Sequence, residues 1–310
     1  MGTTLDEAYE RLHATGPEWG GNLSNHGPMA AEVLARRGHA ADVPRWVDAY
    51  LRRLDELPAA REAITDATWQ RALGDGTRIG DWTAYLARQV ADHPWRDVLV
   101  TWWPRLLPGI AAGATHGVIR AGHAVRTLSS GDESDAAVAE LGYALGYWAA
   151  RSTTVPGVCE PDGRLDPGTA LAGVPHLADQ SGPIAGRLAR LGELAGWPES
   201  VAALSGVADA AAAQARVLDL VDAATLRYLS YGYGSPVLLV HTATAPNTRC
   251  CTCCRCCPAR CGRPASAPCG RRARQSRRAM RPRLRAMCVH PHRPARTTPS
   301  SKPSHTGTSM

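Results

Sequence analysis

The sequence changes composition abruptly between Asn247 and Thr248, and this break confines any hydrophobic core to the first 247 residues. All 9 Trp, all 8 Tyr and all 28 Asp and Glu residues precede the break, whereas nine of the 10 Cys residues follow it. The formal charge is −8 before the break and +15 after it, so the net charge of +7 belongs to the tail. We predict a folded domain of residues 1–247, long enough for one large core, and a disordered basic tail of residues 248–310.

The first 247 residues show helical spacing of apolar side chains almost throughout and very little of the alternation typical of strands. We therefore predict an all-α fold, a single multi-helix domain larger than a four-helix bundle. Residues 153–182 are rich in Pro, Gly and Asp, which predicts a long surface loop. The predicted helices are residues 5–14, 28–38, 43–54, 79–91, 95–112, 115–128, 136–150, 184–195, 207–228 and 236–244.

Targeting and membrane signals are weak in this sequence. The opening segment MGTTLDEAYERL carries three acids and no apolar stretch, so we expect no signal peptide and a cytoplasmic location. The most apolar stretch, residues 98–119, is interrupted by prolines and charged or polar residues, which argues against a membrane span. Cys159 is the single cysteine before the break, so nothing suggests disulfide bonds in the first segment.

Histidines are the residues of the first segment best suited to chemistry, because no nucleophile elbow and no phosphate-binding loop is present. In ATHGVIRAGHAVRTL, His116, Arg120 and His123 recur at i, i+4 and i+7 and therefore share one face of one helix. A buried polar face on an otherwise apolar helix needs partners or a ligand. The alternative interpretation is a pair of structural histidines that form hydrogen bonds to their neighbours.

Two further histidines stand at ends of predicted elements. His26 precedes a helix start marked by Gly27 and Pro28, and His241 follows the apolar run VLLV. Each could be an ordinary structural histidine. Taken together with His116, however, they predict a metal site, since imidazoles from different helices are common ligands for iron, zinc or copper. The absence of an HExxH motif favours a metal that activates dioxygen over hydrolytic zinc.

Three segments of the first part resemble the questin oxidase-like family: NHGPMAAEVL at residues 25–34, THGVIRAGHAVRTL at 115–128 and SYGYGSPVLLVHTATAPN at 230–247. The resemblance runs in order through most of residues 1–247. It implies an oxygenase acting on polycyclic aromatic polyketides such as anthraquinones, by Baeyer–Villiger-type oxygen insertion or ring cleavage. It also implies a mononuclear non-haem iron held mainly by histidines, with a lysine-derived ligand near the C-terminus. NADPH could serve as cosubstrate, and no flavin motif is present.

On this resemblance His26, His116 and His241 are the expected metal ligands, with His123 as the alternative to His116. Arg120 would bind an anionic substrate oxygen or support a ligand. The remaining candidates for substrate or supporting contacts are Asn25, Tyr231 and Tyr233. The expected partners are a small aromatic substrate and dioxygen, with no nucleic acid and no membrane.

The tail departs from the family pattern. It is strongly basic and contains CxxC pairs, which is typical of zinc or nucleic-acid modules, but its cysteines lack regular spacing and it has no aromatic residue. A one-base change of reading frame explains the composition better. Read in that frame, residues 248–263 become compatible with A-[VL]-L-[HY]-[VL]-L-P-[VL]-L-P-x-A-[LV]-[WR]-A, which is rich in leucine.

We therefore expect a frameshift near Asn247, a domain that lacks its C-terminal part, and an impaired enzyme. Lys302 lies in the wrong frame, so it receives no ligand role. Two alternatives remain open: a non-catalytic helical ligand-binding or scaffold protein with structural histidines, and a nucleic-acid binder that acts through the basic tail.

Overall fold

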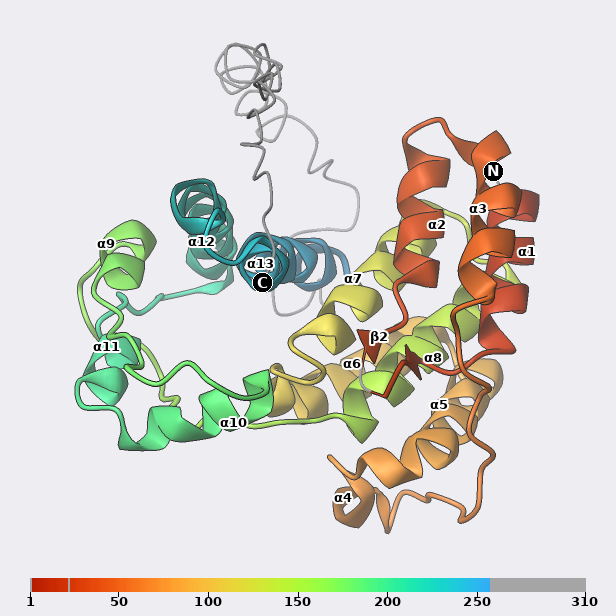
Figure 1. The fold of residues 1–310 in the computed structure, drawn as a ribbon, viewed down its shortest axis with the longest axis horizontal. Coiled ribbons are helices and arrows are strands. Elements are labelled where there is room, and N and C mark those ends of the chain that lie inside the picture. Colours follow the sequence, from red (N-terminus) through yellow and green to blue (C-terminus); the bar gives the residue numbers. More distant parts are fainter. Residues whose placement is uncertain (1, 22, 257–310) are drawn as a thin grey trace, which may run out of the picture. The chain divides into compact units, whose positions relative to one another are not determined.

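The computed structural model describes residues 2–21 and 23–256, with the backbone alone at 2–3 and 247–256 (Figure 1). Contacts divide the chain into two units, Met1–Arg263 and Pro264–Met310, and every described residue belongs to the first. The predicted tail lies outside the described residues except for positions 248–256, which continue the last helix. The frame change, the cysteine pairs and Lys302 stay predictions.

Among the described residues, the regular secondary structure is helical apart from one antiparallel pair of very short strands, so the predicted all-α fold is confirmed. The strands are β1 (Glu18–Trp19) and β2 (Leu23–Ser24). The α-helices are α1 (Gly2–His13), α2 (Gly27–Arg36), α3 (Val43–Leu51), α4 (Trp69–Ala72), α5 (Ile79–Asp92), α6 (Trp95–Leu106), α7 (His116–Leu128), α8 (Asp135–Ala150), α9 (Pro167–Ala172), α10 (Ile184–Ala189), α11 (Trp197–Ala202), α12 (Ala210–Tyr231) and α13 (Pro236–Cys256). Short 3-10 helices are η1 (Ala40–Asp42), η2 (Gly76–Arg78), η3 (Leu107–Gly109) and η4 (Arg190–Glu193).

Every predicted helix corresponds to an observed one, with differences at the ends. The predicted helix 95–112 stops at Leu106 and gives way to η3, and 184–195 divides into α10 and η4. The long loop predicted at 153–182 is wrong in part, because it contains α9. Asp166 starts α9 by accepting hydrogen bonds from the amides of Gly168 and Thr169. The strand pair, α4 and α11 were also missed.

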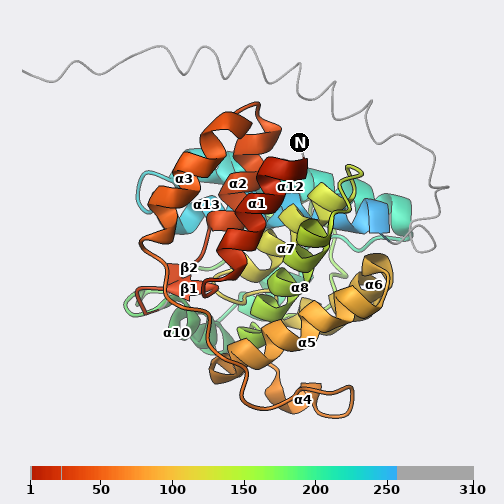
Figure 2. The same ribbon diagram turned by 90° about the vertical axis from the view of Figure 1, so that its right-hand side faces the viewer.

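Helix α8 lies at the centre of the core, between α5 and α7 (Figure 2). Ser134 caps its first turn by accepting a hydrogen bond from the amide of Ala137. A Cβ atom at Gly142 would lie 2.9 Å from the Leu86 carbonyl oxygen of α5, so only glycine allows this close approach of the two helices. The side chains of Trp82 in α5 and Trp148 in α8 are fully buried. This rigid core supports the start of α7, where the histidines gather.

Helices α12 and α13 pack against each other, and α13 also packs across α7. This helix pair exposes several large apolar side chains: Leu226 is 55% exposed and Val237 75% exposed, and Leu218 and Leu229 are exposed as well. Among the described residues, no helix is long and apolar enough to cross a membrane.

We expect the chain as written to give several-fold less soluble protein than a chain in which the alternative reading frame is restored after Asn247. Exposed apolar side chains such as Leu226 and Val237 promote self-association, and the leucine-rich segment of the restored frame would supply apolar surface to pack against them. The measurement is soluble yield under identical expression. Replacing Leu226 and Val237 together by serine in the chain as written should recover part of the yield. Equal yields from the two reading frames would contradict the prediction.

Candidate functional site

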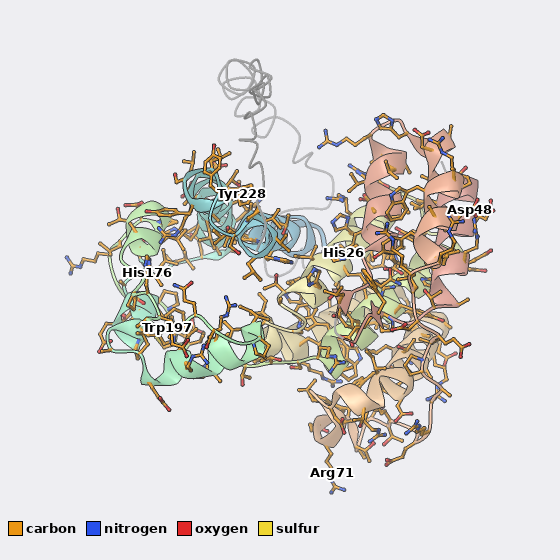
Figure 3. All side chains as sticks on the ribbon, in the orientation of Figure 1. His26, Asp48, Arg71, His176, Trp197 and Tyr228 are labelled. Carbon is orange, nitrogen blue, oxygen red and sulfur yellow. The ribbon has the colours of Figure 1, made fainter. Side chains whose placement is uncertain are left out.

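The structure brings three histidines that are far apart in sequence, His26, His116 and His241, into direct contact. Figure 3 labels His26, which precedes α2. The Nε2 atom of His116 lies 2.9 Å from Nε2 of His26 and 3.0 Å from Nε2 of His241. The rings meet edge to face, at interplanar angles of 88° and 75°. His116 is therefore the central member of the trio, and His26 is its most exposed member.

The loop before α2 fixes the backbone of His26. Asn25 is 3% exposed; its Oδ1 atom accepts a hydrogen bond from the Gly27 amide at 2.8 Å, and its Nδ2 atom donates to the Gly16 carbonyl at 3.0 Å. The amide of His26 donates to the hydroxyl of Tyr50 at 2.9 Å. Asn25, predicted as a supporting residue, thus holds the loop that presents His26 rather than contacting the other imidazoles.

The turn that delivers His116 to the first position of α7 has an unusual backbone. Gly113, Ala114 and Thr115 all have positive φ angles, of 52°, 54° and 71°. Ala114 and Thr115 occupy the left-handed region at a cost in conformational energy, and such conformations persist where the surroundings enforce them. A Cβ atom at Gly113 would overlap the hydroxyl of Tyr147, so the position requires glycine for space as well as for φ.

Each imidazole of the trio uses its other ring nitrogen for a hydrogen bond to a backbone carbonyl. His26 Nδ1 contacts the Ser24 oxygen at 2.7 Å, His116 Nδ1 contacts the Gly113 oxygen, and His241 Nδ1 contacts the Leu238 oxygen at 3.1 Å. A carbonyl oxygen can only accept, so Nδ1 carries the proton in all three rings. The neutral rings then present three unprotonated Nε2 lone pairs to one another.

The three Nε2 lone pairs repel one another, because they lie about 3 Å apart. A positive charge between the Nε2 atoms would relieve this repulsion. A proton is disfavoured: burial, together with the other two imidazoles and despite the carbonyl of Gly113, lowers the pKa of His116 to about 4. Burial likewise lowers the pKa of His26. A metal cation bound between the rings would accept all three lone pairs and leave the Nδ1 hydrogen bonds in place.

The donor set fits a transition metal in chemistry and in its pairwise spacing. Two imidazole nitrogens bound at about 2.1 Å with a right angle between their bonds lie about 3.0 Å apart, close to both observed contacts. Even so, the described ranges contain no group of three or more His, Cys, Asp or Glu side chains whose arrangement could hold a metal ion as it stands. The trio is therefore a set of donors in contact with one another and not a finished coordination shell.

Arg120 is held away from the trio by a buried ion pair. Its guanidinium donates two hydrogen bonds to Glu140 of α8, at 2.7 and 2.8 Å, and both side chains are almost fully buried. His13 adds a third hydrogen bond to Glu140 at 2.7 Å. Burial raises the pKa of Glu140, but the attraction of Arg120 and these hydrogen bonds outweigh it and lower the pKa to about 2. Arg120 thus joins α7 to α8 and is not placed to meet a substrate oxygen.

His123, the alternative to His116, has a different partner. Its Nδ1 atom lies 3.0 Å from Oε2 of Glu32, which is fully buried and also accepts hydrogen bonds from Arg126. This cluster ties α2 to α7 two turns beyond the trio, so of the two histidines it is His116 that joins His26 and His241.

The structure does not place Tyr231 and Tyr233 in a pocket. Tyr231 is 55% exposed at the end of α12, where its ring meets the Arg227 guanidinium at 4.9 Å, and Tyr233 is 91% exposed. The expectation that they line a binding pocket rested on their nearness in sequence to His241, and the turn between α12 and α13 carries both outward.

Sequence reasoning missed the two carboxylates that join α7 to its neighbours and the tyrosine beside the histidine loops. Glu32 and Glu140 are 0% and 1% exposed. Beyond the first turn, each is the single acidic residue among the apolar residues of its helix. That pattern could have indicated a buried carboxylate with a charged partner. Tyr147, Ser24 and Gly113 carry no comparable signal, because their contacts join segments more than 30 residues apart.

Comparisons with known proteins add no relatives: no family model matches the chain, and no curated protein and no solved structure shows significant similarity to it.

Proposed function

We propose that this chain is an oxygenase of the questin oxidase-like type, which holds a mononuclear non-haem iron through His26, His116 and His241 and oxidises a polycyclic aromatic polyketide. The observation that supports the proposal is the convergence of three unprotonated Nε2 atoms, each ring being fixed by its Nδ1 hydrogen bond. The resemblance of the three histidine-bearing segments to that family supports the choice of substrate class.

Bound iron would supply reactivity toward dioxygen, because organic molecules whose electrons are all paired react with dioxygen slowly. The residues of this chain would bind the ion and orient the substrate. Three neutral imidazoles would hold the ion without neutralising it, since no carboxylate belongs to the trio, and an anionic phenolate substrate would then be attracted to the centre. His26 is the exposed member of the trio, so a substrate would approach the trio from the side of His26. The buried hydroxyl of Thr115, without a partner in the described part of the chain, stands beside His116 as a candidate hydrogen-bond donor.

Ring cleavage and oxygen insertion differ in the number of electrons that they require from a donor. Ring cleavage that places both oxygen atoms of O2 in the product needs no further reductant. Insertion of a single oxygen atom, with the other released as water, needs two electrons from a donor such as NADPH. A requirement for NADPH therefore distinguishes oxygen insertion from ring cleavage by this protein.

The test is metal binding followed by turnover. We expect the full chain, loaded anaerobically with Fe(II), to retain about one iron per chain. With ¹⁸O₂ it should transfer label into a hydroxyanthraquinone slowly, in the presence or absence of NADPH, and the chain with the restored reading frame should transfer label faster. Metal content is read by elemental analysis and the label by mass spectrometry. Failure to retain iron or any other divalent metal would contradict the proposal. Binding of the anthraquinone without consumption of dioxygen would favour a non-catalytic ligand-binding protein instead.

A further inference from the structure

The hydroxyl of Tyr147 lies between the two loops that carry His26 and His116. Tyr147 belongs to α8 and is 2% exposed. Its Oη atom lies 2.6 Å from Ser24 Oγ, in the strand before His26, and lies against Gly113, in the turn before His116. One hydroxyl group therefore contacts both segments, although they are almost 90 residues apart in the sequence.

The two contacted residues are those whose carbonyls orient the imidazoles. The Ser24 oxygen accepts the Nδ1 hydrogen bond of His26, and the Gly113 oxygen accepts that of His116. A displacement of either carbonyl would weaken the bond that keeps the proton on Nδ1, and the proton could then move to Nε2. With Nε2 protonated, that ring no longer offers its lone pair to the other two.

The hydroxyl of Tyr147 is itself held in a fixed direction. It donates a hydrogen bond to Oε1 of Glu18 at 3.3 Å, and Glu18 is paired with Arg151 at the end of α8. Because the single hydroxyl proton is used for Glu18, the Tyr147 oxygen accepts the proton of Ser24 Oγ. The Tyr147 ring belongs to the buried core, together with its helix neighbours Leu145 and Trp148. Tyr147 thus transmits the rigidity of α8 to both loops.

We propose that Tyr147 is a positioning residue that fixes the Nδ1–H tautomer and the direction of the His26 and His116 imidazoles. The expected effect of Tyr147 on metal affinity rests on the proposed function, whereas its expected effect on the histidine tautomers does not. Removing the hydroxyl by Tyr147→Phe leaves the ring packing intact but frees Ser24 Oγ and the Gly113 turn. Tyr9→Phe is the matched control, because Tyr9 is 1% exposed and its hydroxyl makes a long contact of 3.4 Å to Thr127, away from the trio.

The experiment uses the full chain labelled with ¹⁵N-histidine and free of metal. Ring ¹⁵N chemical shifts report the tautomer of each histidine. We expect Nδ1–H for His26 and His116 in the wild type and in Tyr9→Phe, and a measurable shift toward Nε2–H at both rings in Tyr147→Phe. Titration with Co²⁺, followed by its absorption spectrum, should show a dissociation constant raised about 10-fold in Tyr147→Phe, the low end for loss of a group that supports a metal ligand.

Each outcome bears on one of the two proposals. Unchanged tautomers and unchanged Co²⁺ affinity in Tyr147→Phe would overturn the positioning role. If the wild type does not bind Co²⁺, the proposed function fails, and the ¹⁵N shifts still decide the role of Tyr147. Should Tyr147→Phe lose its helical circular dichroism, Ser24→Ala removes one of the two links and should shift the His26 tautomer alone, leaving His116 unchanged. A shift at neither ring in Ser24→Ala would also overturn the proposal.

Discussion

Replacement of His116 by alanine is expected to abolish stoichiometric metal binding, raising the dissociation constant for Co²⁺ more than about 100-fold. His116 is the one imidazole whose Nε2 atom contacts both other members of the trio, at 2.9 and 3.0 Å. Its loss leaves His26 and His241 without a shared neighbour, and two separated imidazoles bind a divalent ion weakly. Co²⁺ titration by absorption spectroscopy, supported by elemental analysis of the purified chain, measures the effect.

The matched control for this prediction is His123→Ala. His123 lies on the same face of α7, two turns further on, but its ring contacts Glu32 instead of the trio. We expect its replacement to leave the Co²⁺ affinity within about threefold of the wild type while lowering the free energy of unfolding, since buried Glu32 loses one partner. Loss of metal binding in His123→Ala with retention in His116→Ala would reverse the assignment of the two histidines and contradict the site.

Helix α7 illustrates how far the sequence predicts this protein. Apolar spacing predicted a helix at 115–128, and the observed helix spans His116–Leu128. The same spacing placed His116, Arg120 and His123 on one face, yet it could not say which partner each would meet. That choice depends on Glu140 and Glu32, which reach α7 from α8 and α2. Local periodicity predicts an element, whereas the partners of its polar side chains depend on packing between elements.

The elements that were missed share a physical reason. Helices α4, α9 and α11 have four to six residues, too few to show a helical period. Their ends are set by single residues, such as Asp166 and Pro167 at α9. The outward position of Tyr231 and Tyr233 has a similar origin, because nearness to His241 along the chain says nothing about direction after a turn. The convergence of the three histidines was expected because imidazoles from different helices often share a metal, and from the family resemblance, whereas their spacing along the chain does not predict it.

The second large effect concerns stability: Glu140→Gln is expected to lower the free energy of unfolding by about 3–5 kcal/mol, because it leaves the Arg120 charge buried without its counter-ion. The guanidinium of Arg120 and the carboxylate of Glu140 are 4% and 2% exposed, so water cannot replace the lost partner. The matched control is Asp48→Asn, which breaks the exposed pair with Arg11 and should cost less than about 1 kcal/mol. Urea denaturation followed by circular dichroism measures both changes through the shift of the midpoint.

A double variant separates the charge from the packing. In Arg120→Met with Glu140→Leu, neither charge of the pair remains, and the apolar side chains can fill much of the same space between α7 and α8, while His13 loses its hydrogen bond to Glu140. Its free energy of unfolding should therefore lie well above that of Glu140→Gln and approach the wild type.

The same variant tests whether Arg120 has a part in the reaction, because the ion pair contacts none of the three histidines of the trio. Wild-type Co²⁺ affinity in the double variant would assign Arg120 to the joint between α7 and α8, whereas loss of that affinity in a stably folded double variant would return Arg120 to the site.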